Sequence, residues 1–313
     1  MESDLELLRV ETLRLQFNLK RKYTVNAVED VSFKIRYGET YGLVGESGSG
    51  KSTIGRTLIR LYNPASGRII FKGHDISGRM DKQTSHLLRT KMQMIFQDPS
   101  GCLNPRRKVL DIIAEGLDIH GLYSDNEERK EKVYRILNKV GLAKDHADRY
   151  PHQFSGGQKQ RIGIARVLIM DPDLIIADEA VSALDVSIQA QIVNLMKEMQ
   201  KETHTAYLFI SHDLSMVKYI SDRIGVLHQG YLLEEGRTSE IFDTPVHPYT
   251  KSLLSAIPQP DPLSERGRQV FSYDCSALGI DYSKGEKHWL TDTHYVLSTS
   301  DEIRKWSAAS YTI

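Results

Sequence analysis

Gly45-Glu46-Ser47-Gly48-Ser49-Gly50-Lys51-Ser52 has glycines at its first and sixth positions, followed by lysine and serine. It comes after the apolar run 41–44 and before apolar residues at helical spacing. A strand, a glycine-rich turn and a helix in this order are the context of a phosphate-binding loop. The stretch therefore predicts an α/β fold with a site for a nucleoside triphosphate, and we expect that nucleotide to be ATP.

Each residue type in this loop has a physical reason. Glycines let backbone N–H groups turn towards phosphate oxygens without Cβ clashes, and the following helix presents the positive end of its dipole. Lys51 would neutralise the β- and γ-phosphates, and the Ser52 hydroxyl would be a ligand of Mg²⁺. We expect contacts to ATP from Gly45, Glu46, Ser47, Gly48, Ser49, Gly50, Lys51, Ser52 and Thr53. The loop alone does not distinguish a kinase, a GTPase and a motor protein.

Two acidic residues end a second apolar run, Asp173-Leu174-Ile175-Ile176-Ala177-Asp178-Glu179. Asp178 is a candidate for the Mg²⁺ shell, and Glu179 is a candidate base that orients and deprotonates the attacking water. Taken alone, paired acids at the end of a strand are about as often a solvated turn. The phosphate-binding loop in the same chain favours the catalytic interpretation.

Two kinds of strand pattern occur along the chain. Apolar and polar residues alternate over 13–17 and 31–36, which predicts half-buried strands in an antiparallel N-terminal sheet. Continuous apolar runs predict strands that are covered on both faces, as in a parallel sheet, at 41–44, 174–177 and 206–210. Apolar residues at helical spacing over 188–199 separate two of these runs, which indicates a strand-helix-strand crossover. The fold class is therefore α/β.

The chain also shows boundaries. Between about residues 98 and 160 the strand pattern lapses and polar helical stretches predict an inserted helical subdomain. Beyond Ile257 the run Pro258-Gln259-Pro260-Asp261-Pro262 breaks regular structure, and residues 263–313 have no clear periodicity. We therefore expect a nucleotide-binding domain over residues 1–257 and a C-terminal tail over residues 258–313.

Composition limits the partners and the compartment. Lys plus Arg and Asp plus Glu both number 41, so no net charge draws the chain to nucleic acid or to an anionic membrane. The two cysteines, Cys102 and Cys275, form no CxxC pair, which fits a reducing compartment. The acidic start is not typical of a signal peptide, and no apolar run approaches the roughly 20 residues that span a bilayer. We expect any membrane association to come through a partner.

The segment Phe154-Ser155-Gly156-Gly157-Gln158-Lys159-Gln160-Arg161 lies just ahead of the acidic strand. With it, the sequence resembles the ATP-binding cassette (ABC) ATPases, whose consensus LSGGQ appears here as FSGGQ. The family's order of loop, glutamine, SGGQ, acidic strand, SALD and histidine is kept, and the resemblance covers about residues 5 to 262. It implies a P-loop ABC cassette with a RecA-like parallel-sheet core, an N-terminal antiparallel β subdomain and an inserted helical subdomain.

The resemblance also implies roles for residues outside the loop. Gln97 would touch Mg²⁺ and report the nucleotide state, and His212 would bond the γ-phosphate and steady the water placed by Glu179. Without the family pattern, a lone glutamine or histidine is more often a surface or structural residue. Tyr23 is the candidate that stacks on adenine, ahead of Phe17. Because two cassettes face head to tail in the family, the partner's ATP would be contacted by Ser155, Gly156, Gly157, Gln158 and Asp185.

Two positions depart from the family pattern. Phe154 replaces leucine, and Ala180 follows Glu179 where proline is common. Neither change removes a ligand or a base. We therefore expect the site in this chain, and the site that it completes in a partner, to be competent.

The segment from His247 to Pro258 resembles the tail of the ATPase subunits of oligopeptide, dipeptide and nickel importers, and most of all the second, F-type, subunit of peptide importers. This resemblance implies an ATP-hydrolysing subunit of a peptide importer, peripheral on the cytoplasmic face of the cell membrane. Its partners would be a second ABC ATPase, alike or different, two transmembrane permease subunits and an extracellular or periplasmic solute-binding protein. Because the tail has only Cys275, we expect no iron-sulfur or zinc site.

Three alternatives share part of this chemistry. An ABC importer for nickel or another small solute fits the same tail. A soluble ABC ATPase that acts on nucleic acid or ribosomes usually has two cassettes or basic surfaces, whereas this chain has one loop, one SGGQ and balanced charge. A P-loop kinase has no use for SGGQ. We therefore expect no nucleic-acid partner.

Overall fold

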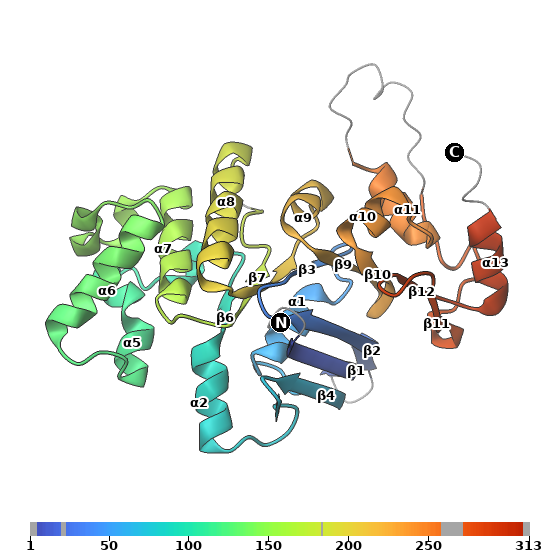
Figure 1. Ribbon diagram of the computed structural model, residues 1–313, viewed down its shortest axis with the longest axis horizontal. Helices are drawn as coiled ribbons and strands as arrows, with labels where there is room; N and C mark the ends of the chain where they lie inside the picture. Colours follow the sequence, from blue (N-terminus) through green and yellow to red (C-terminus); the bar gives the residue numbers. More distant parts are fainter. Residues whose placement is uncertain (1–4, 20–22, 183, 258–271, 309–313) are drawn as a thin grey trace.

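A central eight-stranded sheet carries the fold. The computed structural model describes residues 5–19, 23–182, 184–257 and 272–308 (Figure 1). Its strand order is β11-β12-β10-β9-β3-β8-β7-β6. The strands from β9 to β6 pair in parallel, and they are β3 (Thr40–Val44), β6 (Met92–Ile95), β7 (Leu174–Asp178), β8 (Ala206–Ile210) and β9 (Arg223–His228). Every residue of β3, β7 and β8 is buried, so the predicted parallel core is confirmed.

A second, antiparallel sheet is formed mainly by the N-terminal part of the chain. Its order is β2-β1-β4-β5, with β1 (Glu6–Leu19), β2 (Tyr23–Arg36), β4 (Ser66–Phe71) and β5 (His74–Asp75). Leu13 lies opposite Val31, and both are fully buried, as the alternating pattern predicts. The antiparallel N-terminal sheet is therefore confirmed.

Helices cover the central sheet and extend beyond its β6 edge. Figure 1 shows α5, α6 and α7 at one end of the molecule and the C-terminal elements at the other. The helices up to the middle of the chain are α1 (Lys51–Leu58), α2 (Lys82–Lys91), α3 (Pro99–Cys102), α4 (Val109–Ile113), α5 (Glu115–His120), α6 (Asn126–Lys139) and α7 (Gly156–Leu168), with the 3-10 turns η1 (Lys144–Asp148) and η2 (Pro151–Gln153). The next helices along the chain are α8 (Val186–Thr203), α9 (Leu214–Ile220), α10 (Thr238–Asp243) and α11 (Pro248–Ser255).

The helical stretch after β6 has ordinary local causes. In α6 the Asp125 side chain caps the helix by accepting hydrogen bonds from the N–H groups of Glu127 and Glu128, both at 2.9 Å. The buried residues Val133 and Ile136 recur at helical spacing and face the core. The helices α3 to α6 and the start of α7 fall within the range 98–160, and α7 runs on to Leu168.

The C-terminal residues 272–308 form structure that the sequence pattern does not predict. They contain η3 (Tyr282–Lys284), β11 (Glu286–Trp289), β12 (Tyr295–Ser298) and α13 (Ser300–Ala308). Strand β12 pairs antiparallel with β10 (Tyr231–Arg237), which pairs with β9, so this hairpin continues the central sheet. Two four-residue strands are too short to show a clear period. The proline-rich run 258–262 lies outside the described residues, and the domain division at residue 258 stays a proposal about the sequence.

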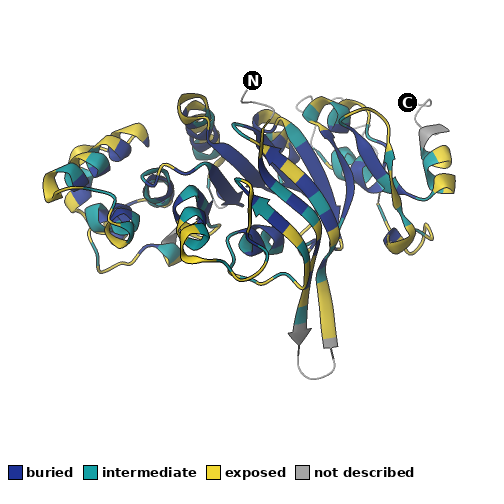
Figure 2. Cartoon of the chain, turned by 60° about the horizontal axis from the view of Figure 1, so that its bottom comes forward, coloured by how far each residue is buried: buried dark blue, intermediate teal, exposed yellow. Residues whose placement is uncertain are grey.

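The central sheet separates two apolar cores. Successive residues of a strand point to opposite faces. In β7, Leu174 and Ile176 belong to the core beneath the N-terminal sheet and α1, whereas Ile175 and Ala177 belong to the core beneath α7, α8 and α9. Figure 2 shows the buried residues concentrated in the sheets and the exposed ones on the outer faces of the helices. Among the described residues, no helix combines the length and apolar character that crossing a membrane requires.

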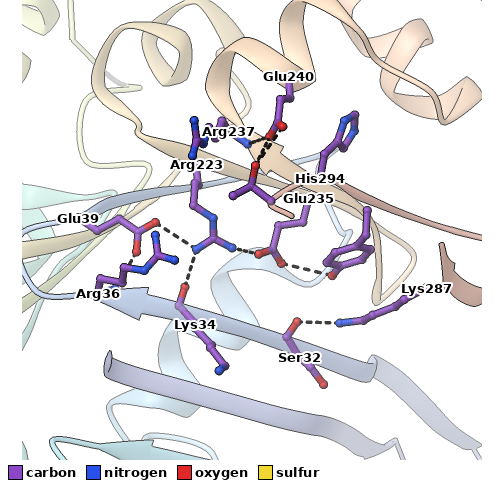
Figure 3. A network of polar contacts seen from close by, with 12 residues as sticks. Ser32, Lys34, Arg36, Glu39, Arg223, Glu235, Arg237, Glu240, Lys287 and His294 are labelled. Atoms are coloured by element: carbon purple, nitrogen blue, oxygen red, sulfur yellow. Dashed lines mark hydrogen bonds and ion pairs between the residues drawn. The ribbon is translucent and has the colours of Figure 1, made fainter. Parts of the chain in front are cut away.

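A buried polar network joins the two sheets. Arg223, at the start of β9, donates a 3.1 Å hydrogen bond to Glu39, pairs with Glu235 of β10 and donates to the carbonyl of Lys34 in β2 (Figure 3). The Tyr295 hydroxyl of β12 donates to Glu235 at 3.3 Å. Since buried charges are costly unless paired, this network ties the C-terminal hairpin to the rest of the fold.

Candidate nucleotide-binding site

The glycine-rich loop connects the carboxyl end of β3 to the start of α1. Gly45 has φ 150°, and a Cβ atom there would lie 2.0 Å from the carbonyl oxygen of Leu227. At Gly50, with φ 107°, a Cβ atom would lie 2.5 Å from the carbonyl oxygen of Ala27. Only glycine allows this backbone path between strands β2 and β9. The loop therefore passes close to both strands before it enters α1, whose N-terminus suits an anion.

Lys51 lies inside the loop that it follows. Its ammonium group donates to the carbonyl oxygens of Gly45 and Glu46, both at 2.7 Å, and to the Ser49 hydroxyl at 3.3 Å. Burial lowers the pKa of Lys51, while the charges of Glu179 and Asp178 oppose that shift. The site thus holds a buried ammonium group, and oxygen atoms of the loop fix its position.

Asp178 and Ser52 place two oxygen ligands side by side. The Ser52 hydroxyl donates to Asp178 Oδ1 at 2.6 Å, and the Arg56 guanidinium lies 3.8 Å from Oδ2. Burial raises the pKa of Asp178, and the hydrogen bond from Ser52 and the charge of Arg56 oppose the rise. A carboxylate beside a hydroxyl is the donor set that Mg²⁺ prefers, so these residues fit that ion.

Glu179 directly follows Asp178, the last residue of β7, and its carboxylate contacts side chains from two other segments. The Gln97 side-chain amide donates to Oε2 at 2.7 Å, and Nδ1 of His212 lies 3.2 Å from Oε1. Its backbone has φ 48°, which is uncommon for a residue with a Cβ. The Glu179 N–H donates to the carbonyl of Ile210, and Ser182 donates to the Glu179 carbonyl, so the surroundings maintain this conformation. The structure therefore brings together the predicted base, the predicted glutamine and the predicted histidine.

A pocket of about 520 Å³ lies beside the glycine-rich loop and Glu179. Its lining includes the predicted residues Ser47, Gly48, Gly50, Lys51, Ser52, Thr53, Gln97 and Glu179. It also includes residues that sequence reasoning missed, namely Val25, Asn26 and Ala27 of β2 and Gln229 after β9. No motif distinguishes these four, because chain topology alone brings them to the loop.

The adenine-stacking residue stays a prediction. Tyr23 begins β2, two positions before the pocket residue Val25, and its side chain is outside the described part of the structure. The second choice, Phe17, packs edge-on against Tyr62 with ring centres 5.2 Å apart. What the structure shows is that strand β2 supplies part of the pocket wall through Val25, Asn26 and Ala27.

The SGGQ residues do not line this pocket. Ser155 caps α7, since its hydroxyl accepts from the Gln158 N–H at 3.3 Å and the Gln158 side chain accepts from the Ser155 N–H at 3.0 Å. Gly157 packs against α8, where a Cβ atom would lie 2.9 Å from Ile188 Cγ2. Asp185 is exposed at the start of α8. The start of α7 is thus a second glycine-rich helix N-terminus, separate from the one that begins α1.

A link between these two regions has no signature in the sequence. Gln160, two residues after the SGGQ run, is buried and donates from its amide to the Ala180 carbonyl at 2.5 Å. Ala180 directly follows Glu179. Helix α7 is therefore hydrogen-bonded to the turn that carries the predicted base.

The chain is similar to known proteins over nearly its whole length. A sequence profile described as "ABC transporter" matches residues 28–182, and one described as "Oligopeptide/dipeptide transporter, C-terminal region" matches residues 233–273. The oligopeptide transport ATP-binding protein OppF of Bacillus subtilis (strain 168) is 55% identical, over 96% of this chain and 99% of that protein. The dipeptide transport ATP-binding protein DppF of Lactococcus lactis subsp. cremoris (strain MG1363) is 51% identical, over 95% of each.

Solved structures agree with these relatives. The structure of cbiO1 from Clostridium perfringens, part of the ABC transporter complex cbiONQ, matches with a TM-score of 0.67 and 29% identity, over 76% of this chain and 91% of that one. A dimeric structure of the ATP-binding cassette MJ0796 bound to ADP and Pi matches with a TM-score of 0.68 and 26% identity, over 74% of this chain and 98% of that one.

Proposed function

This chain belongs to the ABC transporter family of ATP-binding proteins, and from that premise we propose that it hydrolyses ATP to power the import of peptides. One observation carries the proposal. Glu179 is held between Gln97 and His212 beside the phosphate-binding loop, in a chain about half identical to oligopeptide and dipeptide transport ATP-binding proteins. This geometry supports the ATPase, and the relatives support the peptide cargo.

Each residue of the nucleotide site has its own role in ATP hydrolysis. The loop N–H groups other than that of Glu46, together with Lys51, bind the β- and γ-phosphates. A Mg²⁺ ion would be held by Ser52, Asp178 and Gln97 and would supply further charge neutralisation. Glu179 accepts a proton from the attacking water, which forms a bond to the γ-phosphorus while the bond to the bridging oxygen breaks. His212 bonds the γ-phosphate and steadies that water. The products are ADP and phosphate.

A second cassette is needed because the SGGQ helix start lies outside the pocket of its own chain. We infer that Ser155 to Gln158 and Asp185 contact the ATP held by a partner cassette, which is either a copy of this chain or a different one. The dimeric MJ0796 structure supports such an arrangement. ATP would then lie between the two cassettes, and hydrolysis would release them.

A groove beside Gln97 supports docking of membrane subunits. It has a volume of about 330 Å³, and its lining includes the apolar residues Met92, Met94, Phe96 and Met170 beside polar and charged residues such as Arg89 and Glu115. Methionine-rich grooves suit an inserted helix, because their side chains adapt to its shape. Phe96 precedes Gln97 in the chain, so a helix in this groove would act on the site directly. We infer two transmembrane permease subunits, an extracellular or periplasmic solute-binding protein, and a location on the cytoplasmic face of the membrane.

Transport into proteoliposomes tests the whole proposal. The chain is purified with its membrane subunits and the second cassette, and uptake of a labelled peptide is measured with ATP inside the vesicles. Lys51→Ala should abolish ATP-dependent uptake, whereas Lys284→Ala, at a side chain that is 73% exposed, should leave it unchanged. Uptake that persists in Lys51→Ala, or native mass spectrometry that finds the chain only alone or on ribosomes, would contradict the proposal.

Assembly has its own test. The specific ATPase activity of the purified chain should rise with its concentration, or should require the second cassette, because each site needs residues from two chains. A constant specific activity in a chain shown to be monomeric would exclude the two-cassette arrangement.

A further inference from the structure

A tyrosine near the C-terminal end of the chain contacts the phosphate-binding loop. Tyr249 of α11 is fully buried, and its hydroxyl oxygen accepts a 2.9 Å hydrogen bond from the N–H of Glu46. The two residues are 203 positions apart. This N–H therefore points to the tyrosine and is not one of the donors available to a phosphate.

The contact sets the direction of a single peptide plane. The N–H of Glu46 and the C=O of Gly45 belong to the same peptide, and no cis peptide occurs among the described residues. In a trans peptide these two groups point in opposite directions. The Gly45 carbonyl accepts from the Lys51 ammonium at 2.7 Å. One rigid peptide thus connects the Tyr249 hydroxyl to Lys51.

Tyr249 is itself held in a cluster of rings. Its ring centre lies 4.2 Å from that of His228 and 5.3 Å from that of Tyr273. The hydroxyls of Tyr273 and Tyr282 are 2.8 Å apart, and the Tyr282 hydroxyl lies 2.7 Å from Nδ1 of His228. The Tyr249 N–H donates to the His247 side chain, which caps α11. Residues on both sides of the proline-rich run therefore fix the position of this one hydroxyl.

We propose that Tyr249 is a positioning residue for Lys51, acting through the Gly45–Glu46 peptide plane. This inference rests on the proposed function, because it assigns Lys51 to the phosphates of ATP. Without the hydroxyl, the Gly45–Glu46 peptide keeps only its bond to Lys51, and a smaller fraction of the molecules holds the loop in the orientation that binds ATP. The apparent dissociation constant rises in inverse proportion to that fraction.

Three phenylalanine variants of the full chain separate positioning from packing. Tyr249→Phe keeps the ring and removes the hydroxyl. Tyr273→Phe disturbs the same ring cluster without touching the loop. Tyr207→Phe removes a hydroxyl that is equally buried but has no hydrogen-bond partner among the described residues. The probe is AMPPNP with Mg²⁺, titrated calorimetrically, and the melting temperature is measured alongside.

Tyr249→Phe should weaken AMPPNP binding about tenfold, the usual scale for stranding one buried donor. Tyr273→Phe and Tyr207→Phe should bind within twofold of the unaltered chain. In the assembled ATPase, Tyr249→Phe should raise the KM for ATP much more than it changes kcat. Unchanged affinity, or an equal loss in Tyr273→Phe, would overturn the positioning role and leave only packing.

Hydrogen exchange in the unaltered chain provides a second measurement. The Glu46 amide should be protected as strongly as the amides of α1. Exchange at the rate of an open loop would overturn the proposal even if Tyr249→Phe folds poorly. Failure of the unaltered chain to bind AMPPNP would instead contradict the nucleotide site itself, so the two failures are distinguishable.

Discussion

Gln97 donates a 2.7 Å hydrogen bond from its side-chain amide to the carboxylate of Glu179. The preceding residue, Phe96, lines the apolar groove proposed for a membrane subunit. We propose that a movement in that groove reaches the candidate base through the Gln97 side chain. In that proposal, the link between transport and hydrolysis lies in the adjacent residues Phe96 and Gln97.

Replacing Gln97 should lower the stimulated ATPase rate without lowering nucleotide binding. Gln97→Ala should lower the ATPase rate stimulated by the membrane subunits about tenfold, because a hydrogen bond to a charged group is lost. Binding of AMPPNP should change little. Gln83→Ala is the control, since Gln83 is exposed in α2 and does not line the groove, and it should leave the stimulated rate unchanged. Stimulation that survives in Gln97→Ala would show that the signal takes another route.

Glu179→Gln should preserve nucleotide binding and remove the base. We expect turnover to fall roughly 10²- to 10⁴-fold, the usual contribution of general acid-base catalysis. A single-turnover assay with labelled ATP measures this step apart from product release. Glu202→Gln, at an exposed glutamate of α8 that pairs with Lys139, should retain full activity. Normal turnover in Glu179→Gln would require a different base.

Acid should destabilise the chain through His247. Burial, with a smaller contribution from His228, lowers the pKa of His247 from 6.5 to about 3. Below pH 6.5 the unfolded chain takes up a proton there that the folded chain takes up only near pH 3. Above the unfolded-state pKa of 6.5 this group costs the folded state no stability. As the pH falls from 6.5 towards 3, the free energy of unfolding decreases, because only the unfolded chain is protonated at His247. By pH 4 the loss reaches about 3 kcal/mol, at roughly 1.4 kcal/mol for each pKa unit.

The His247→Asn variant tests this linkage, because asparagine can still accept the hydrogen bond that caps α11. Urea unfolding between pH 4 and pH 7 should show a shallower pH dependence than in the unaltered chain. His204→Asn, at an exposed residue in the left-handed conformation that asparagine tolerates, should keep the original dependence. Identical pH profiles for His247→Asn and the unaltered chain would assign the acid sensitivity to other groups.

Arg223→Met should destabilise the fold by about 3 to 5 kcal/mol, because it leaves buried carboxylates of Glu39 and Glu235 without their cation. Chemical denaturation measures the change. The control Arg68→Met removes an arginine that is 60% exposed and pairs with Glu11 and Asp75, and it should cost less than about 1 kcal/mol.

A compensating change checks the cause of that loss. Adding Glu235→Leu to Arg223→Met removes one stranded carboxylate and should recover part of the stability. An equal loss in the single and double variants would show that the arginine acts through packing alone.

The short-range parts of this site could be predicted because each is built from contiguous residues. The loop from Gly45 to Ser52 needs its glycines and lysine at set spacings, since consecutive backbone groups surround the phosphates. The continuous apolar strands could also be predicted from the sequence, because burial on both faces of the sheet excludes polar residues. The position of Glu179 at the end of β7 could be predicted for the same reason.

Contacts between distant segments could not be predicted in this way. Residues 286–298 show no clear strand pattern, yet they continue the central sheet, because β10 offers an edge to which short strands can pair. The bond from Gln160 to the Ala180 carbonyl likewise depends on how α7 packs on the sheet.

The sequence by itself thus determined the nucleotide loop, the fold class and the family, whose signals are local patterns. Only the tertiary structure decided that Tyr249 contacts the amide of Glu46, and that Gln97 and His212 meet at Glu179. The physical reason is that hydrogen-bond partners far apart in the chain are selected by how the sheets and helices pack. Eight consecutive residues suffice to identify a phosphate-binding loop. The hydroxyl that orients it here belongs to Tyr249 of α11, which is held by the rings of His228 and Tyr273.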